Sequence, residues 1–564
     1  MYTIRVYHLS DLVHIEEDSE LLPEAWRRKS EETANQLKLR GNEAVKQKKW
    51  WTAINEYSRA LRQNPTEEEK VIIKRNRALA FIRTSQFDAA LEDTGFPDFG
   101  ELPNDKALYR AGEALYTLQR FKECADVVGL LRSKFPDSRD AKPLEEKVKI
   151  RIKEQDTGVY DFAGMQKQAA RTTPPLLDHA TYIGPMEVKN TKKKGRGMFT
   201  TRPVKAGELL LCEKAFAYVW VDSNGSNAHP LMNLALRNLQ FGGQLMLIRD
   251  ILQKLSHTPS KVESIGKLHH GTYKPADNTY VDGKPVVDTF LVERIVDLNG
   301  FGFERRSLDT LNRRRYHTPP PLGLWATAAY MNHSCVSSAH RACIGSMMII
   351  RAEHDLPAGT ELTLQYMSPG QGAEPGSIGN CWGIECNCAY CDDYKSTPAR
   401  KLEQRKALRE MYNQTMGARQ INFPKVKQYL RQLADTFSKP VDQVPRYELL
   451  ELYWGLMAAA ADRGEWALCL SAVGELLRVV GYQVEGFGDK KGEKVRILKF
   501  GMGCAYAIEG LMLAREALKK LGRAGEIDDV TSLAKTTYKI TLGEDETFHE
   551  SYKDLMEGRK EWGY

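Results

Sequence analysis

Residues 330–340 have the sequence YMNHSCVSSAH, which places an asparagine, a histidine, a serine and a cysteine next to one another. Three interpretations are open for this stretch: a nucleophilic Ser/His/Cys cluster, a metal site, or a loop that is only polar. No nucleophile elbow of the G-x-S-x-G kind surrounds Ser334, which argues against the first. The segments before and after the stretch decide between the others.

Length and composition limit the classes of protein to consider. The chain has 564 residues, enough for two to four domains, and its 42% apolar and 27% charged residues are typical of folded proteins. No run approaches about 18 apolar residues and no secretory signal begins the chain, so we expect neither a membrane span nor export. The net charge of +7 is mild, and we expect no direct nucleic-acid binding. An intracellular protein of the cytoplasm, the nucleus or both is predicted.

The cysteines are unevenly distributed. Four of the ten, Cys381, Cys386, Cys388 and Cys391, fall within eleven residues. In a reducing compartment such clustering favours metal binding over disulfides. Cys381 precedes the C-x-C-x-x-C pattern and is expected to be a spectator.

Residues 31–150 show helical periodicity with internal similarity. Gly41, Ala78 and Gly112 take the same place in successive units, spaced 37 and 34 residues apart, and Pro65 and Pro136 follow Gly41 and Gly112 at the same offset of 24. Small residues let two helices approach closely, and a proline ends the second helix of each pair. The pattern resembles the tetratricopeptide repeat, in three copies. The alternative is an ordinary helical bundle with chance spacing.

From about residue 183 the pattern changes to short β-type runs broken by Gly and Pro. Five motifs follow in order: KGRGMF (194–199), NGF (299–301), YMNHSC (330–335), ELTLQY (361–366) and CWGIECNCAYC (381–391). Together they resemble a SET-domain protein methyltransferase, closest to the SMYD-like branch with a split SET domain and a cysteine-rich post-SET segment. The resemblance covers about 183–393.

The expected fold class is multidomain α+β: an all-α repeat solenoid, a β-rich SET domain and an all-α C-terminal domain. The expected parts are an N-terminal extension (1–30), a tetratricopeptide domain of three repeats and a capping helix (31–150), a linker (151–182), a SET domain (183–370) with a helical insertion (about 221–320), a post-SET zinc segment (371–395) and a C-terminal helical, repeat-like domain (396–564).

The resemblance implies an S-adenosylmethionine-dependent protein-lysine N-methyltransferase acting on a histone or another protein. Tyr366 is the implied catalytic residue, with its hydroxyl at the methyl-transfer centre. Together with Trp382 it would line a narrow substrate channel, where desolvation favours the neutral lysine amine. The residues implied to border the cofactor are Lys194, Gly195, Arg196, Gly197, Asn299, Asn332, His333, Tyr366 and Ile384. A turn is the alternative for Asn299, and a core histidine for His333.

The resemblance also implies a structural zinc ion. Its ligands would be Cys335, Cys386, Cys388 and Cys391, because four thiolates form a closed tetrahedral site. Such an ion would hold the post-SET segment against the SET core.

The sequence departs from the family in two places. The family pattern is N-H-S-C-x-P-N, and in this chain Ser337 and Ser338 replace its last two residues. This replacement puts the hydrogen bonds of the missing asparagine in question. No cysteine lies between Trp220 and Asn299, so a MYND zinc finger is absent there. An inactive or weak SET/repeat adaptor is therefore the alternative function, and binding of a lysine-bearing tail without turnover is a third.

The repeats contain a second group of polar residues. Lys38 and Asn42, and likewise Lys106 and Arg110, are spaced four apart on one helical face, and Asn76 has the equivalent place in the middle unit. These five residues resemble the carboxylate clamp of repeats that hold the C-terminal EEVD peptide of heat-shock chaperones. A solvated basic face that binds nothing is the alternative.

Overall fold

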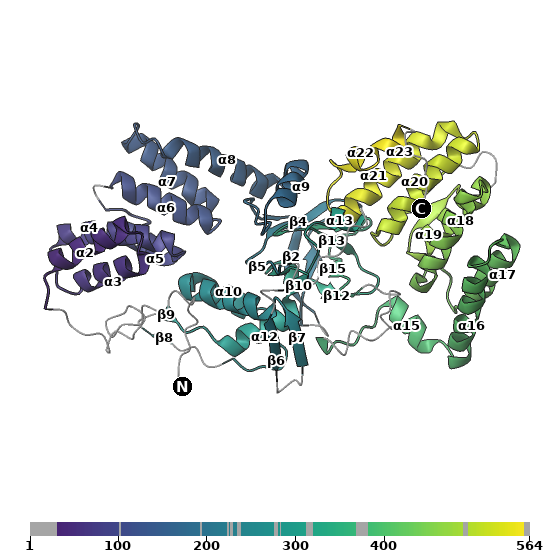
Figure 1. Ribbon diagram of the computed structural model, residues 1–564, viewed down its shortest axis with the longest axis horizontal. Helices are drawn as coiled ribbons and strands as arrows, with labels where there is room; N and C mark the ends of the chain where they lie inside the picture. Colours follow the sequence, from purple (N-terminus) through teal and green to yellow (C-terminus); the bar gives the residue numbers. More distant parts are fainter. Residues whose placement is uncertain are drawn as a thin grey trace.

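The computed structural model shows three regions in sequence order (Figure 1). Helices of the first part lie at one end, strands occupy the middle, and the last helices lie at the other end. The expected mixed α+β fold class is confirmed. The residues predicted as an N-terminal extension, 1–30, lie outside the described part. The structure describes residues 31–100, 103–191, 195–222, 225, 229–233, 238–275, 280–281, 284–311, 320–367, 382–488 and 494–557.

The first region consists of helix pairs joined by short loops. Thr33 and Thr66 each begin the first helix of a pair with a capping box, in which side chain and backbone satisfy each other. A Cβ atom added to Gly41 would lie 2.5 Å from the Tyr57 ring, so only glycine allows this close packing. The helices are α2 (Ala34–Lys46), α3 (Trp50–Leu61), α4 (Glu67–Arg83), α5 (Phe87–Thr94), α6 (Asp105–Thr117), α7 (Phe121–Lys134) and α8 (Ala141–Thr157).

The segment predicted as a linker is packed against the strands. Its helix α9 (Phe162–Arg171) begins at Asp161, whose side chain accepts from the Gly164 backbone amide. Phe162 and Met165 are buried in one cluster with Cys212 and Ile349 of the central sheet. The irregular TTPP stretch follows α9, as the sequence pattern indicates.

The central region contains three small sheets, with strand orders β1-β4-β14-β13, β10-β11-β5 and β12-β15-β3-β2. Trp325 is fully buried among them, and its indole N–H donates to the Ser346 carbonyl at 3.2 Å. The strands are β1 (Tyr182–Ile183), β2 (Met186–Thr191), β3 (Gly195–Thr200), β4 (Leu209–Lys214), β5 (Ala217–Val219), β10 (Phe301–Gly302), β11 (Leu322–Leu324), β12 (Asn332–His333), β13 (Ala339–Ile344), β14 (Met347–Ala352) and β15 (Glu361–Leu364).

Helices lie between β5 and β11, where the sequence predicts a mostly helical insertion. Two hairpins that the sequence pattern does not predict accompany them. The elements are β6 (His229–Asn233), β7 (Asn238–Gly242), α10 (Gln244–His257), η2 (Pro259–Lys261), α11 (Val262–Gly266), β8 (Tyr280–Val281), β9 (Lys284–Pro285), α12 (Thr289–Asn299), α13 (Ser307–Leu311) and η3 (Ala328–Tyr330), the last of which follows β11.

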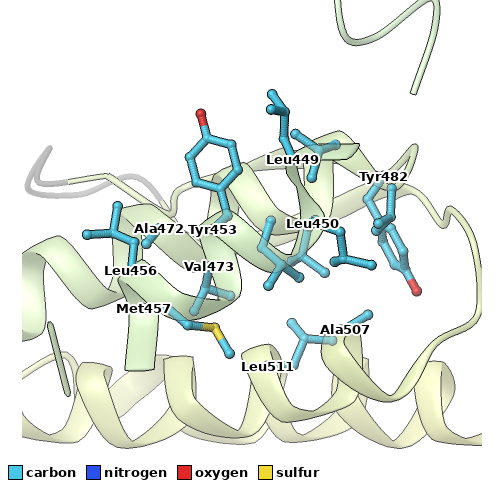
Figure 2. Packing of buried hydrophobic residues seen from close by; sticks show 14 of the residues in the cluster. Leu449, Leu450, Tyr453, Leu456, Met457, Ala472, Val473, Tyr482, Ala507 and Leu511 are labelled. Atoms are coloured by element: carbon cyan, nitrogen blue, oxygen red, sulfur yellow. The ribbon is translucent and has the colours of Figure 1, made fainter. Parts of the chain in front are cut away.

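The last region is helical, with one added hairpin. Figure 2 shows Leu450, Met457, Val473 and Leu511 meeting between three of its helices. Its elements are α15 (Ala389–Ser396), α16 (Ala399–Met416), α17 (Phe423–Ala434), η4 (Tyr447–Leu449), α18 (Leu450–Asp462), α19 (Trp466–Val479), β16 (Gln483–Glu485), β17 (Arg496–Lys499), α20 (Ala505–Lys520), η5 (Ala524–Glu526), α21 (Ile527–Leu542), α22 (Phe548–Ser551) and α23 (Lys553–Met556).

The central and last regions share a core. Cys335, Cys386 and Cys391 belong to the same buried cluster as the helices of the last region. The buried Arg351 of β14 donates to the Gly543 carbonyl at 2.7 Å, directly after α21. The buried Glu353 accepts from the Gly503 amide at 3.2 Å. Within the described residues, no helix combines the length and the apolarity that crossing a lipid bilayer requires.

Candidate active site

Two distant segments lie side by side at the centre of the site. Strand β12 pairs in parallel with β15, so that Asn332 is opposite Thr363 and His333 is opposite Leu364. Beyond the strands, the Ser334 amide donates to the Leu364 carbonyl at 3.1 Å. This pairing brings the YMNHSC motif against ELTLQY and positions Tyr366, which lies two residues beyond β15.

Tyr366 is a neutral hydrogen-bond donor in this setting. Its hydroxyl donates to the Met331 carbonyl at 2.8 Å. Burial raises the pKa of Tyr366 to about 12, although the nearby charge of Arg341 opposes the shift. The phenol therefore keeps its proton at neutral pH and remains a hydrogen-bond donor.

A cavity of about 230 Å³ lies in front of Tyr366. The predicted channel residue Trp382 is part of its wall, with its ring 5.6 Å from that of Tyr366. Ile384 is half-buried and is not among the residues that surround the cavity. The residues that line the cavity are Leu298, Asn299, Gly300, Phe301, Gly302, Ala329, Arg341, Tyr366 and Trp382.

Asn299 is at this wall, but its amide group also stabilises the local backbone. It is 6% exposed and ends α12. Its Nδ2 donates to the His269 carbonyl at 2.7 Å and to the Ile295 carbonyl at 2.8 Å. Both N–H groups are thus used within the protein, which leaves Oδ1 and the backbone as the groups that could contact a ligand.

The glycine-containing start of strand β3, called the glycine loop below, lies directly against Asn332. The Asn332 Nδ2 donates to the Arg196 carbonyl at 3.1 Å and to Glu361 Oε1 at 2.8 Å. A Cβ atom on Gly197 would lie 2.9 Å from that same Nδ2, so a side chain there would displace the asparagine. Gly195 has φ of +70°, which glycine adopts freely. Lys194, predicted with these residues, lies outside the described part.

Arg196 covers one side of this loop. Its guanidinium lies 5.0 Å from the centre of the Tyr330 ring and donates to the Lys267 carbonyl in the insertion. The structure therefore brings Gly195, Arg196, Gly197 and Asn332 together, as the resemblance implies.

The four predicted zinc ligands also come together, from positions up to 56 residues apart. The sulfur atoms of Cys335, Cys386, Cys388 and Cys391 all lie within 4.8 Å of one another, and those of Cys335 and Cys391 are 3.6 Å apart. Thiolates bound at about 2.3 Å to a tetrahedral zinc ion lie about 3.8 Å apart, so the geometry fits zinc. Hydrogen bonding among the thiols, with Cys335 the main cause, lowers the pKa of Cys388. Cys381, the expected spectator, lies outside the described residues.

His333 connects the cysteine cluster to Tyr366. Its Nδ1 accepts from the Tyr366 backbone amide at 3.1 Å, so the ring proton belongs on Nε2. Nε2 lies 3.4 Å from the Cys335 sulfur, to which it can donate. The ring is buried, and it is not among the residues that surround the cavity. Its predicted contact with a cofactor would thus be made by the backbone.

Ser337 and Ser338 fill the place where the sequence departs from the family pattern. The Ser338 hydroxyl donates to the Glu361 carbonyl at 2.9 Å and accepts from the Thr363 amide at 2.9 Å. The Ser337 hydroxyl donates to the buried Glu353 at 2.9 Å. Both serines are buried. The loop is therefore held to β15 by hydrogen bonds of Ser338 that stand where those of the missing asparagine were in question.

The predicted clamp residues lie on the first helices of the three pairs, α2, α4 and α6. Asn42 Oδ1 accepts from Asn76 Nδ2 at 3.1 Å and from the Tyr57 hydroxyl at 2.7 Å. Arg110 donates to the Arg75 carbonyl of the preceding first helix. Lys38 is half-buried, and Lys106 is exposed. Neighbouring helices thus bring Asn42 and Asn76 into contact.

Arg341 was not predicted as part of the cavity, and its only sequence signal was a charge within the apolar run AHRACIGSMMII. Phe301 belongs to the NGF motif, but its stacking on Phe303, which does not line the cavity, was not predicted. Glu361, which orients Asn332, was also missed because glutamates at strand ends are common on protein surfaces.

Comparisons with known proteins agree with this site. A model of the SET domain family matches residues 195–367. A methyltransferase of Gibberella zeae is 30% identical over 577 residues, covering 97% of this chain and 78% of that protein. The mouse protein-lysine N-methyltransferase SMYD4 is 24% identical over 39% of this chain and 29% of its own length. The chain therefore belongs to the SET-domain methyltransferases.

The repeats have relatives of their own. The small glutamine-rich tetratricopeptide repeat-containing protein 2 of Mycosarcoma maydis is 35% identical over 98 residues, 16% of this chain and 26% of that protein. The solved Arabidopsis OM64 TPR domain is 30% identical and is covered to 93%, against 21% of this chain, with a TM-score of 0.19. The N-terminal helical region of this SET-domain methyltransferase is similar in sequence to the Mycosarcoma maydis repeat protein.

Proposed function

We propose that this protein is an S-adenosylmethionine-dependent protein-lysine N-methyltransferase whose repeats dock a protein partner. The observation that carries the proposal is the Tyr366 hydroxyl, held at 2.8 Å by the Met331 carbonyl in the wall of an aromatic cavity. In the adjoining loop, Asn332 is bonded to the backbone of the glycine segment. Gly195, Arg196, Gly197, Asn332, His333 and Asn299 would hold the cofactor, which supplies the methyl group as an electrophile.

The chain's own residues would act by alignment and by exclusion of water. A lysine amine reacts only when it is neutral, and an enclosed aromatic cavity favours its neutral form. Tyr366 and Trp382 provide such surroundings, with rings 5.6 Å apart. Because the Tyr366 hydrogen is donated to Met331, its oxygen lone pairs remain available to contact the reacting centre. Holding nitrogen and carbon in line at roughly 3 Å accounts for a large part of such a rate enhancement.

The cysteine cluster would keep the channel wall in place. Trp382 is four residues before Cys386, and it packs against the core that contains Cys335 and Cys391. A zinc ion bound by the four thiolates would fix this wall relative to Tyr366. His333 would transmit the position of Cys335 to the Tyr366 backbone through its two ring nitrogens.

The repeats would bind an acidic C-terminal peptide of the EEVD type. Lys38, Lys106 and Arg110 supply positive charge, and Asn42 and Asn76 supply amide groups on adjacent helices. An arginine and lysines on one concave face suit a pair of carboxylates. A chaperone bound there would bring clients, and hence lysine substrates, to the cavity.

We infer an intracellular location, in the cytoplasm, the nucleus or both.

One observation favours the alternative function, an adaptor without turnover. Arg341 places a cation in the cavity where a sulfonium and a lysine amine would meet. Like charges within a few ångströms in an enclosed site oppose each other strongly. The firm hydrogen bonds of Ser337 and Ser338, by contrast, remove the earlier reason to expect a degraded site.

Calorimetric titration with S-adenosylmethionine tests the proposal first. The wild-type protein and Tyr366→Phe should bind it, whereas Asn332→Ala should lose most of the affinity because the glycine loop loses its anchor. Incubation of the protein with a denatured proteome and labelled cofactor, followed by mass spectrometry, should then reveal methylated lysines. A zinc-replete, folded protein that binds no cofactor would contradict the enzyme and support the adaptor.

A further inference from the structure

The cavity contains a charge that its proposed contents do not explain. Arg341 lies on β13 and contributes to the wall beside Tyr366. It is the one charged side chain among the nine described residues that line the cavity. The cavity is therefore positive, although the groups expected to react in it are themselves cationic or become so.

Arg341 is held by aromatic rings rather than by an acid. Its guanidinium lies 4.8 Å from the centre of the Phe303 ring and 5.4 Å from that of Phe301. Within the described residues, no hydrogen bond or ion pair to this guanidinium is present. Burial lowers the pKa of Arg341. The side chain is half-buried, and it lines the cavity.

Aromatic contact offsets only part of the cost of removing this charge from most of its water, because ring faces attract a cation more weakly than a paired carboxylate does. A guanidinium also has five N–H donors in a planar fork, and ring faces satisfy them poorly. The aromatic contacts therefore leave these donors without hydrogen-bond partners among the described residues. A planar, oriented and unpaired guanidinium facing a cavity suits a bidentate carboxylate.

We propose that Arg341 binds a carboxylate group inside this cavity. Two sources share that chemistry: the amino-acid end of the cofactor, or an acidic group of the substrate next to the methyl acceptor. The assignment of these sources rests on the proposed function, whereas the carboxylate site itself rests on the cavity alone. A bound carboxylate would neutralise the cavity and remove the repulsion that a lysine amine or a sulfonium would otherwise meet.

The test uses the full-length, zinc-loaded protein and two variants. Arg341→Met keeps a long side chain against Phe301 and Phe303 without charge, and Arg341→Lys keeps the charge without the fork. Calorimetry compares S-adenosylhomocysteine with 5′-methylthioadenosine, which lacks the amino-acid carboxylate. Glutarate and its uncharged diamide are titrated against the protein saturated with 5′-methylthioadenosine. The signal is the fluorescence of Trp382, and Trp382→Phe shows whether the fluorescence change comes from that residue.

The two sources give different results. If Arg341 holds the cofactor, Arg341→Met should weaken the binding of S-adenosylhomocysteine about 10- to 100-fold and leave the affinity for 5′-methylthioadenosine unchanged. If it holds the substrate, S-adenosylhomocysteine should be unaffected, and the preference for glutarate over the diamide should disappear. Arg341→Lys should be intermediate in either case.

Other results overturn the proposal. Equal binding of every carboxylate by wild type and Arg341→Met would make Arg341 a packing residue, and so would equal loss of 5′-methylthioadenosine and S-adenosylhomocysteine. If neither nucleoside binds the wild type, the proposed cofactor is wrong. Glutarate, titrated alone, would then still decide the carboxylate site through the same variants.

Discussion

The repeats and the strand crossing at Tyr366 both arrange polar side chains, but their contacts span different distances along the chain. In the repeats, Asn42 bonds Asn76, 34 residues later, and each helix packs on its neighbours. At the crossing, Cys335 meets Cys391, and Glu353 meets Gly503, 150 residues later. Damage to a repeat should therefore remain local, whereas damage to the crossing should spread into the last helical region.

Loss of the proposed zinc ion should give the largest difference in effect between the strand crossing and the repeats. Cys388→Ser should remove most of the zinc, lower the melting temperature of the central region by about 10 °C and abolish methyl transfer, because four ligands are needed to hold the channel wall. Hydrogen exchange in α2–α7 should not change. Elemental analysis and exchange mass spectrometry measure both effects.

The matched control for that change is Cys504→Ser, which alters a cysteine outside the cluster and should keep the zinc. A metal-free wild type with unchanged exchange around Trp382 would contradict the structural role of the cluster.

Removal of the Tyr366 hydroxyl should damage chemistry without damaging the fold. Tyr366→Phe should lower kcat about 100-fold, as for the loss of one preorganised polar group, and change the cofactor Kd less than about threefold. Steady-state kinetics and calorimetry provide these values. Tyr160 offers a close control, since its buried hydroxyl also donates to a backbone carbonyl at 2.8 Å. Tyr160→Phe should destabilise the protein by about 1 kcal/mol and keep kcat; a similar fall in kcat for both variants would deny Tyr366 a special role.

The clamp can be broken without touching the crossing. The double variant Lys38→Ala, Arg110→Ala should bind an EEVD-ending peptide at least about 10-fold more weakly, because two charged contacts to carboxylates are lost. Fluorescence anisotropy with a labelled peptide measures the change, and transfer to a free peptide substrate should be unaffected. Lys46→Ala, on the same helix α2, serves as the control. Equal peptide affinity in all three proteins would leave these residues as a solvated basic face.

The smallest expected effect sharpens the comparison within the crossing itself. Ser338→Ala removes the hydroxyl that bonds the Glu361 carbonyl and the Thr363 amide, and should cost about 1–2 kcal/mol of stability with a modest fall in kcat. Chemical denaturation followed by near-ultraviolet circular dichroism measures the cost. Ser264→Ala, at an exposed position of the insertion, should have no effect, and an equally silent Ser338→Ala would mean that the loop is held by its neighbours alone.

The fold class was predictable because a single sequence shows both the spacing of the helical repeats and the order of the SET-domain motifs. Gly41 at its repeat position has the close contact with Tyr57 that the spacing indicates. The cysteines after residue 381 and the NHSC cysteine were grouped by resemblance, and their sulfur atoms do converge. Ordered motifs thus predicted which segments meet around the site.

Side-chain direction was less predictable. The amide of Asn299 bonds two backbone carbonyls, and the ring of His333 bridges Cys335 and Tyr366, and neither use follows from residue type or spacing. Arg341 was missed because a charge within an apolar strand reads the same whether it faces water or a cavity. The hairpin of β6 and β7 was missed because the run LALR between its strands favours a helix in sequence.

The shared core of the cysteine cluster and the last helices has a practical consequence for anyone who dissects this enzyme. A fragment that stops after α15 would retain all the SET motifs but expose the apolar faces of Cys335, Cys391 and Tyr390, which α18 and its neighbours now cover. We expect such a fragment to aggregate, to be readily degraded by proteases and to be easily oxidised at its thiols. The catalytic unit of this protein, in the sense of the smallest piece that can be purified alone, therefore extends well past its cysteine motif.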